Sequence, residues 1–125
     1  MTAEFKYPST VRGILSVTDM PVVCIDNASF FTYVNKAFED AYGWKSKELI
    51  GKSVTTIMPK HMKNAHMVGF SRFVVTEQSR VLGKPLPLKI CKSDGEVQDM
   101  KLFIRGEKKD STWRFAAIIK PASNV

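Results

Sequence analysis

The chain has 125 residues, of which 44% are hydrophobic and 25% charged, with a formal net charge of +7. This length suits one domain with a core of its own. No apolar run approaches the roughly 18 residues that cross a membrane, and the first ten residues lack the layout of a secretion signal. We therefore expect a cytoplasmic protein without membrane insertion.

The positive charge is spread along the chain and forms neither a basic arm nor a recognition motif. This distribution argues against nucleic-acid binding and favours solubility or the docking of an acidic partner. Cys24 and Cys91 lie in apolar, strand-like sequence and form no C-x-x-C pair, so we expect reduced, buried thiols. Because no Ser-His-Asp or Cys-His ordering, phosphate loop or acid pair stands out, we expect no enzyme.

The first predicted element is a short helix within residues 9–17, with Val11, Ile14 and Leu15 on one side. That apolar side has no evident place in a domain that closes without it. A flanking helix of this kind packs on its own domain or on a second copy of it, and we expect this one to support a homodimer.

A hairpin follows, with strands at 22–25 and 30–34 around a turn at 26–29. Asn35 is a suitable N-cap for the next helix, residues 36–42. Its apolar side chains are expected to join the core.

The longest predicted helix spans Met58 to Thr76 and begins near Pro59, which fits a first helical turn. Helical spacing places seven residues on one face: Met62, Ala65, His66, Gly69, Phe70, Phe73 and Val74. Gly69, one turn after His66, is expected to leave bare backbone that a flat ligand could approach.

The pattern after Thr76 changes to a period of two, which is typical of strands. Three strands are predicted, separated by turns at 93–96 and 106–110. They form a meander that can join the first hairpin in one five-stranded antiparallel sheet. The helices then cover one face of this sheet, which gives a single α+β domain.

Three stretches of the sequence, YVNKAFEDAYGW, ELIGKSV and the Asp-Gly turn of KSDGE, resemble PAS domains. The resemblance covers residues 19–121, with residues 1–18 as a flanking segment and 122–125 as a tail. It implies the PAS fold, with a small pocket between sheet and helices. It also implies a sensory module that dimerises and passes signals to an output domain such as a kinase or a cyclase.

Within this family, the spacing MP-x6-H-x5-RF is similar to the haem-binding PAS domains of rhizobial oxygen-sensing kinases. The similarity implies haem b with His66 as the axial iron ligand. Leu86 stands where that subgroup has the arginine that stabilises bound oxygen. The resemblance implies further cofactor contacts from Phe70, Arg72, Arg80, Met100, Leu102 and Ile104.

Two alternatives to haem remain open. A neutral imidazole can coordinate iron, but a single histidine on an apolar helix face is commonly part of a core. The pocket is then empty or filled by Met62, Phe70 and Phe73, or it holds a non-covalent flavin or a metabolite. Without any ligand, the chain is a PAS interaction or dimerisation module.

Overall fold

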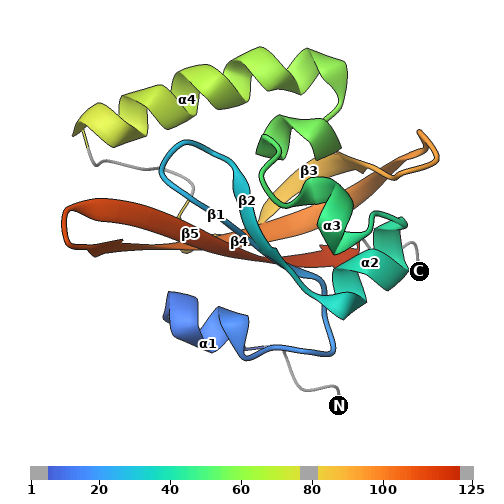
Figure 1. Ribbon diagram of the computed structural model, residues 1–125, viewed down its shortest axis with the longest axis horizontal. Coiled ribbons are helices and arrows are strands. Elements are labelled where there is room, and N and C mark those ends of the chain that lie inside the picture. The colour runs from blue at the N-terminus through green and yellow to red at the C-terminus, as the bar shows by residue number, and fades with distance from the viewer. Residues whose placement is uncertain (1–5, 77–81, 122–125) are drawn as a thin grey trace.

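The computed structural model describes residues 6–76 and 82–121 (Figure 1). The order of helices and strands is the one that the sequence predicts. The elements are α1 (Val11–Leu15), β1 (Val22–Ile25), β2 (Phe31–Val34), α2 (Lys36–Tyr42), α3 (Ser46–Leu49), the 3-10 turns η1 (Val54–Ile57) and η2 (Lys60–Met62), α4 (Lys63–Thr76), β3 (Leu86–Cys91), β4 (Val97–Lys109) and β5 (Thr112–Pro121).

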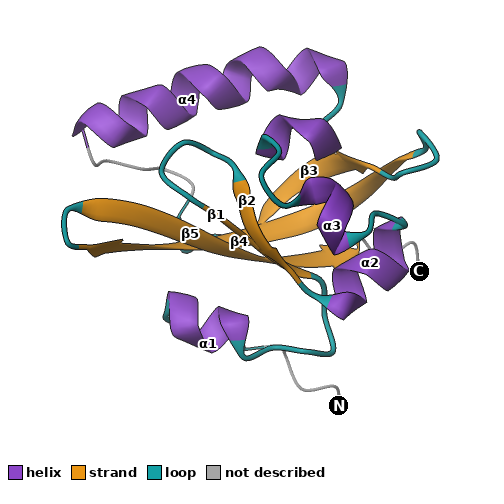
Figure 2. Cartoon of the chain, in the orientation of Figure 1, coloured by secondary structure: helices purple, strands orange, loops and turns teal. Residues whose placement is uncertain are grey.

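The five strands form one antiparallel sheet in the order β2-β1-β5-β4-β3 (Figure 2). The first hairpin thus joins the meander through β1 and β5, and the predicted sheet is confirmed. The turn predicted at 106–110 is wrong, because β4 continues to Lys109 and pairs there with Thr112. Asp110 and Ser111 form the turn with φ angles of 52° and 66°. Positive φ at both positions matches the twist of the flanking strands.

Asn35 joins α2 to the start of β1. Its side-chain oxygen accepts hydrogen bonds from the backbone N–H of Phe38 (3.0 Å) and of Val22 (2.9 Å). Its amide group donates to the carbonyl oxygen of Met20 (2.9 Å). The predicted N-cap is therefore confirmed, and it also fixes where the chain enters the sheet.

Most helices cover one face of the sheet, and α1 covers the other (Figure 1). The residues buried on the side of α2, α3 and η1 are Val23, Phe31, Val34, Phe38, Tyr42, Leu49, Val54, Ile57, Ile90, Met100, Ala117 and Ile119. Those buried on the side of α1 are Val11, Ile14, Val22, Cys24, Phe103, Ala116 and Ile118.

The role predicted for the apolar side of α1 is wrong. Val11 and Ile14 are buried inside the domain against β1, β4 and β5, and Leu15 packs beside them. The sheet has a second apolar face that needs a cover, and α1 supplies it. These residues therefore leave no free apolar side for a dimer.

Candidate functional site

A cavity of about 80 Å³ lies between the sheet and the helical layer. Of the twelve described residues that line it, eleven are apolar and the twelfth is His66 of α4. The lining residues are Val23, Ile25, Val54, Ile57, His66, Met100, Leu102, Ile104, Phe115, Ala116, Ala117 and Ile119. The structure thus brings four of the predicted site residues together: His66, Met100, Leu102 and Ile104.

The other predicted site residues do not line this cavity. Leu86 is half-buried at the start of β3 and pairs with Leu102. Phe70 stacks on the His66 ring, with 5.8 Å between the ring centroids. Arg72 belongs to α4, but its side chain lies outside the described part of the structure, as does all of Arg80.

The inner face of α4 is narrower than predicted. Ala65 and Gly69 are exposed, and a Cβ atom added to Gly69 would meet nothing within 4 Å. The predicted inner residues that are buried or half-buried are His66, Phe70 and Phe73 of α4 and Met62 of η2, and the side chain of Val74 lies outside the described part of the structure. The predicted bare backbone beside His66 therefore faces solvent instead of the pocket, and that prediction is wrong.

His66 has a buried polar partner that the sequence does not reveal. Its Nε2 atom lies 3.0 Å from the Oγ atom of Ser29, in the turn between β1 and β2. Ser29 is fully buried and has a φ of 69°, in the left-handed region. The Asp26 carboxylate holds this turn by accepting hydrogen bonds from the backbone N–H of Ala28 (2.9 Å) and Phe30 (3.0 Å).

The backbone of Ser29 also connects the turn to η1. Its N–H donates to the carbonyl of Asp26 (3.1 Å), and its own carbonyl accepts from the N–H of Val54 (2.7 Å). Val54 lines the cavity. Ser29 is therefore a junction between the first hairpin, η1 and α4.

The described side chains that line the cavity carry no charge. Burial lowers the pKa of the His66 imidazole, so the ring is uncharged at neutral pH. A neutral imidazole has one donor and one acceptor nitrogen, and the tautomer decides which of His66 and Ser29 donates. Among the residues that the structure describes, no group of three His, Cys, Asp or Glu side chains could hold a metal ion.

An aromatic cluster lies next to the cavity. Phe73 of α4 meets Trp113 and Phe115 of β5 edge to face, with centroid distances of 4.9 and 5.4 Å. Gly106 pairs with Phe115 across the β4–β5 ladder, and a Cβ atom there would lie 3.1 Å from the Phe115 ring. The missing side chain at Gly106 therefore gives the rings room to stack. This cluster fastens the second half of α4 to the sheet.

The cavity and its residues do not fit a haem. Pockets for ligands of drug size enclose about 300–1,000 Å³, and haem and flavin need at least such a space. The cavity of about 80 Å³ is several times smaller. The Nε2 atom of His66 is also engaged by Ser29.

A sequence profile of the PAS fold matches residues 15–103 of the chain. The protein therefore belongs to the PAS family, and the predicted fold is confirmed. PAS domains are in general sensory and signalling modules without catalytic activity. No helix in the described ranges is long and apolar enough to cross a membrane.

Known proteins share the fold at low identity. An uncharacterised protein of Azorhizobium caulinodans is 25% identical over 114 residues, which are 90% of this chain and 16% of that protein. A PAS domain from Desulfitobacterium hafniense has a TM-score of 0.68 at 21% identity, covering 86% of this chain and 97% of its own. A PAS domain of a two-component sensor histidine kinase has a TM-score of 0.68 at 10% identity, covering 86% and 89%.

Proposed function

We propose that this PAS domain is a sensory module whose input is a small molecule in the cavity beside His66. Its state passes to a signalling output domain or a partner protein, and the domain has no catalytic activity of its own. The observation that carries this proposal is a cavity whose described lining residues are apolar apart from His66. The likeness to a sensor-kinase PAS domain supports an output of this kind.

The size of the cavity sets the class of ligand. An engineered apolar cavity of about 150 Å³ binds benzene or xenon, and the cavity of this protein measures about 80 Å³. A ligand of a few heavy atoms therefore fits. We expect it to be uncharged, because none of the described lining residues supplies a counter-charge.

The test is binding of xenon, which needs no hydrogen bond. We expect xenon pressure to shift the amide NMR signals of the lining residues and to leave those of α1 unchanged. Ala117→Val adds two methyl groups to the cavity wall and should weaken the xenon response, whereas Ala41→Val on an exposed site should not. A wild-type chain without any response in the cavity would contradict the proposal.

Haem with His66 as the axial ligand is the rival hypothesis within the same function. Because the cavity does not fit this group, we expect no Soret band, either in purified protein or after haem is added. A Soret band that His66→Ala removes would restore the haem hypothesis. A flavin spectrum would instead point to the other cofactor class.

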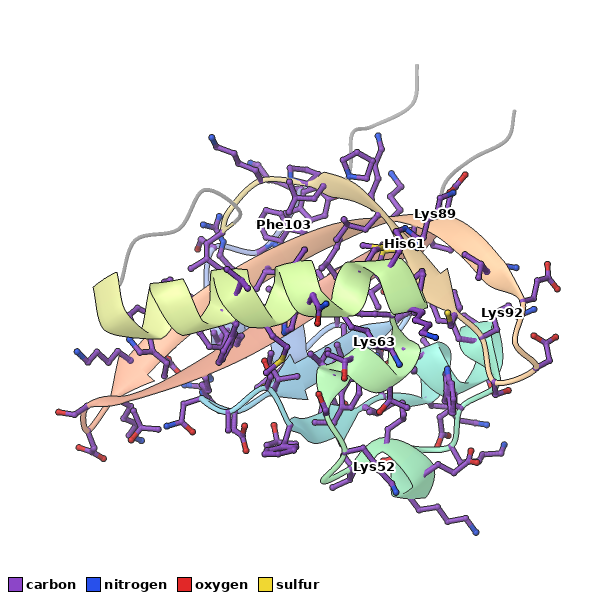
Figure 3. All side chains as sticks on the ribbon, turned by 90° about the horizontal axis from the view of Figure 1, so that it is seen from above. Lys52, His61, Lys63, Lys89, Lys92 and Phe103 are labelled. Carbon is purple, nitrogen blue, oxygen red and sulfur yellow. The ribbon has the colours of Figure 1, made fainter. Side chains whose placement is uncertain are left out.

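A second candidate function is a cofactor-free interaction or dimerisation module. The outer side of α4 favours it, because Met67 and Val68 are 44% and 61% exposed there. Lys63, in the first turn of this helix, is exposed and adds a positive charge, and Figure 3 shows its place at the start of α4. An apolar surface beside positive charge suits an acidic partner or, if the charges are accommodated, a second copy. Light scattering of wild type and Val68→Glu tests this candidate, and an unchanged monomer in both would remove the homodimer.

A further inference from the structure

The one polar side chain among the described residues of the cavity wall already has a partner. His66 lines the cavity, and its Nε2 atom forms a hydrogen bond of 3.0 Å with the fully buried hydroxyl of Ser29. The other lining side chains offer a ligand only dispersion contacts. A hydroxyl group on a bound ligand can therefore find a side-chain partner in this wall only by competing with Ser29 for His66.

We propose that the ligand is a small uncharged molecule with one hydroxyl group, and that it is sensed when this group takes the place of Ser29 at His66. This inference rests on the proposed sensory function and specifies its ligand class and its switch. At His66 the exchange breaks one neutral hydrogen bond and forms another, so the net change in free energy at the imidazole is small. Apolar contacts in the cavity then supply the affinity.

The exchange has a structural consequence at the turn between β1 and β2. Ser29 is held in the left-handed region, with φ at 69°, and its hydroxyl has no access to solvent. Once His66 is engaged elsewhere, the buried hydroxyl lacks its partner, which is costly. The turn relieves this cost by moving, because a strained backbone persists only when its surroundings hold it.

Movement of the turn reaches both η1 and the protein surface. The Ser29 carbonyl accepts the 2.7 Å hydrogen bond from Val54, so η1 follows the turn. The next residue, Phe30, is 42% exposed and forms an isolated bridge with Ser53. The buried hydroxyl of Ser29 is thus next to Phe30, which lies on a surface that a partner can contact.

Two probes separate the hydroxyl from the apolar contacts: propan-2-ol, which carries one hydroxyl, and xenon, which carries none. We expect Ser29→Ala to bind propan-2-ol about two- to tenfold more tightly than wild type, since the competitor is gone. The xenon affinity should stay unchanged. His66→Phe keeps a ring in the cavity wall but removes both nitrogen atoms, so its xenon affinity should stay unchanged. When Ser29→Ala is combined with His66→Phe, it should no longer tighten the binding of propan-2-ol.

The switch has its own readout in the wild-type chain. Saturating propan-2-ol should shift the imidazole ¹⁵N signals of His66 and speed amide exchange at Val54, whereas xenon should do neither. Ser29→Gly serves as a second variant where Ser29→Ala fails to fold, because glycine adopts a φ of 69° without strain.

The outcomes distinguish the two levels of the proposal. Xenon that does not enter the wild-type cavity overturns the proposed function. Suppose that xenon enters the cavity but wild type and Ser29→Ala bind propan-2-ol with equal affinity. The proposed hydrogen-bond exchange is then wrong, while the cavity remains a binding site. Propan-2-ol that binds without any change in His66 signals or Val54 exchange overturns the switch.

Discussion

The two faces of the sheet are covered by helices of very different length and fit. The short helix α1 has five residues and buries two of them, Val11 and Ile14. The long helix α4 has fourteen residues, yet among its described side chains only Phe73 is buried, while Met67 and Val68 are exposed. Helix length is therefore a poor guide to how firmly an element is held.

The difference lies in what fills the space beneath each helix. The face under α1 is closed by side chains from α1 and three strands, with Ile14, Ala116 and Ile118 fully buried. The other face contains the cavity, and His66 in its wall links α4 to the first hairpin through a hydrogen bond to Ser29. Dense packing stabilises the first face, and sparse packing leaves α4 able to move at a lower cost.

The largest expected effect is at Phe73, the anchor of α4. Phe73→Ala removes the edge-to-face contacts with Trp113 and Phe115 and should lower the free energy of unfolding by about 3–5 kcal/mol. Urea unfolding followed by circular dichroism measures this change. Phe30→Ala, at an exposed position, is the control and should cost under about 1 kcal/mol. Equal stability of both variants would mean that the aromatic cluster does not fasten α4.

The next effect compares the two helices directly. Ile14→Ala creates a cavity in the closed face and should cost about 2–5 kcal/mol. Val68→Ala on the outer side of α4 should change stability by less than about 0.5 kcal/mol. Both changes in the free energy of unfolding are obtained from the midpoints of urea unfolding at an unchanged m-value. A large cost at Val68 would show that the outer side of α4 is covered, for example by a second copy of the chain.

The smallest expected effect is a pH dependence from His66. Burial lowers its pKa in the folded state, so the unfolded chain binds more protons below neutral pH. The stabilising contribution is fully present above about pH 6.5 and is lost as the pH falls towards the lowered pKa. We expect thermal melts to show this loss in wild type and in His61→Gln, which alters an exposed histidine. His66→Phe should flatten the profile, and an unflattened profile would assign the pH dependence to other groups.

Much of the fold follows from local patterns. The change from a period of 3.6 to a period of 2 after Thr76 predicts the three-stranded meander, and Asn35 predicts the start of α2. The alternation of Met100, Leu102 and Ile104 predicts a strand, and the resemblance to PAS domains implies that this strand lines a pocket; all three residues lie in the cavity wall. These features depend on neighbours in sequence, so a single sequence contains them.

The position of α1 could not be taken from its own residues, since an apolar helix side fits a dimer as well as a core. The strand Val22–Ile25 does carry a signal, because four apolar residues in a row indicate burial on both faces. The width of the inner face of α4 was overestimated at Ala65 and Gly69. Small residues tolerate either side of a helix and so do not fix its rotation.

The partnership of His66 with Ser29 could not be predicted. The two residues are 37 positions apart, and a serine in a polar turn normally faces water. Only the packing of α4 over the first hairpin buries the hydroxyl and brings the imidazole to it. The volume of the cavity is likewise set by the final fit of all its lining side chains.

The chain contains two tryptophans, and they lie beside different elements of the pocket-side face. Trp113 contacts Phe73 of α4, while the indole N–H of Trp44 donates to the backbone carbonyl of Cys91 (2.9 Å), near α2 and α3. Movement of α4 away from the sheet would expose the Trp113 ring to water and red-shift its fluorescence. The emission of Trp44 would stay unchanged. With Trp44 replaced by phenylalanine, the protein becomes its own optical reporter of helix position, without an attached dye.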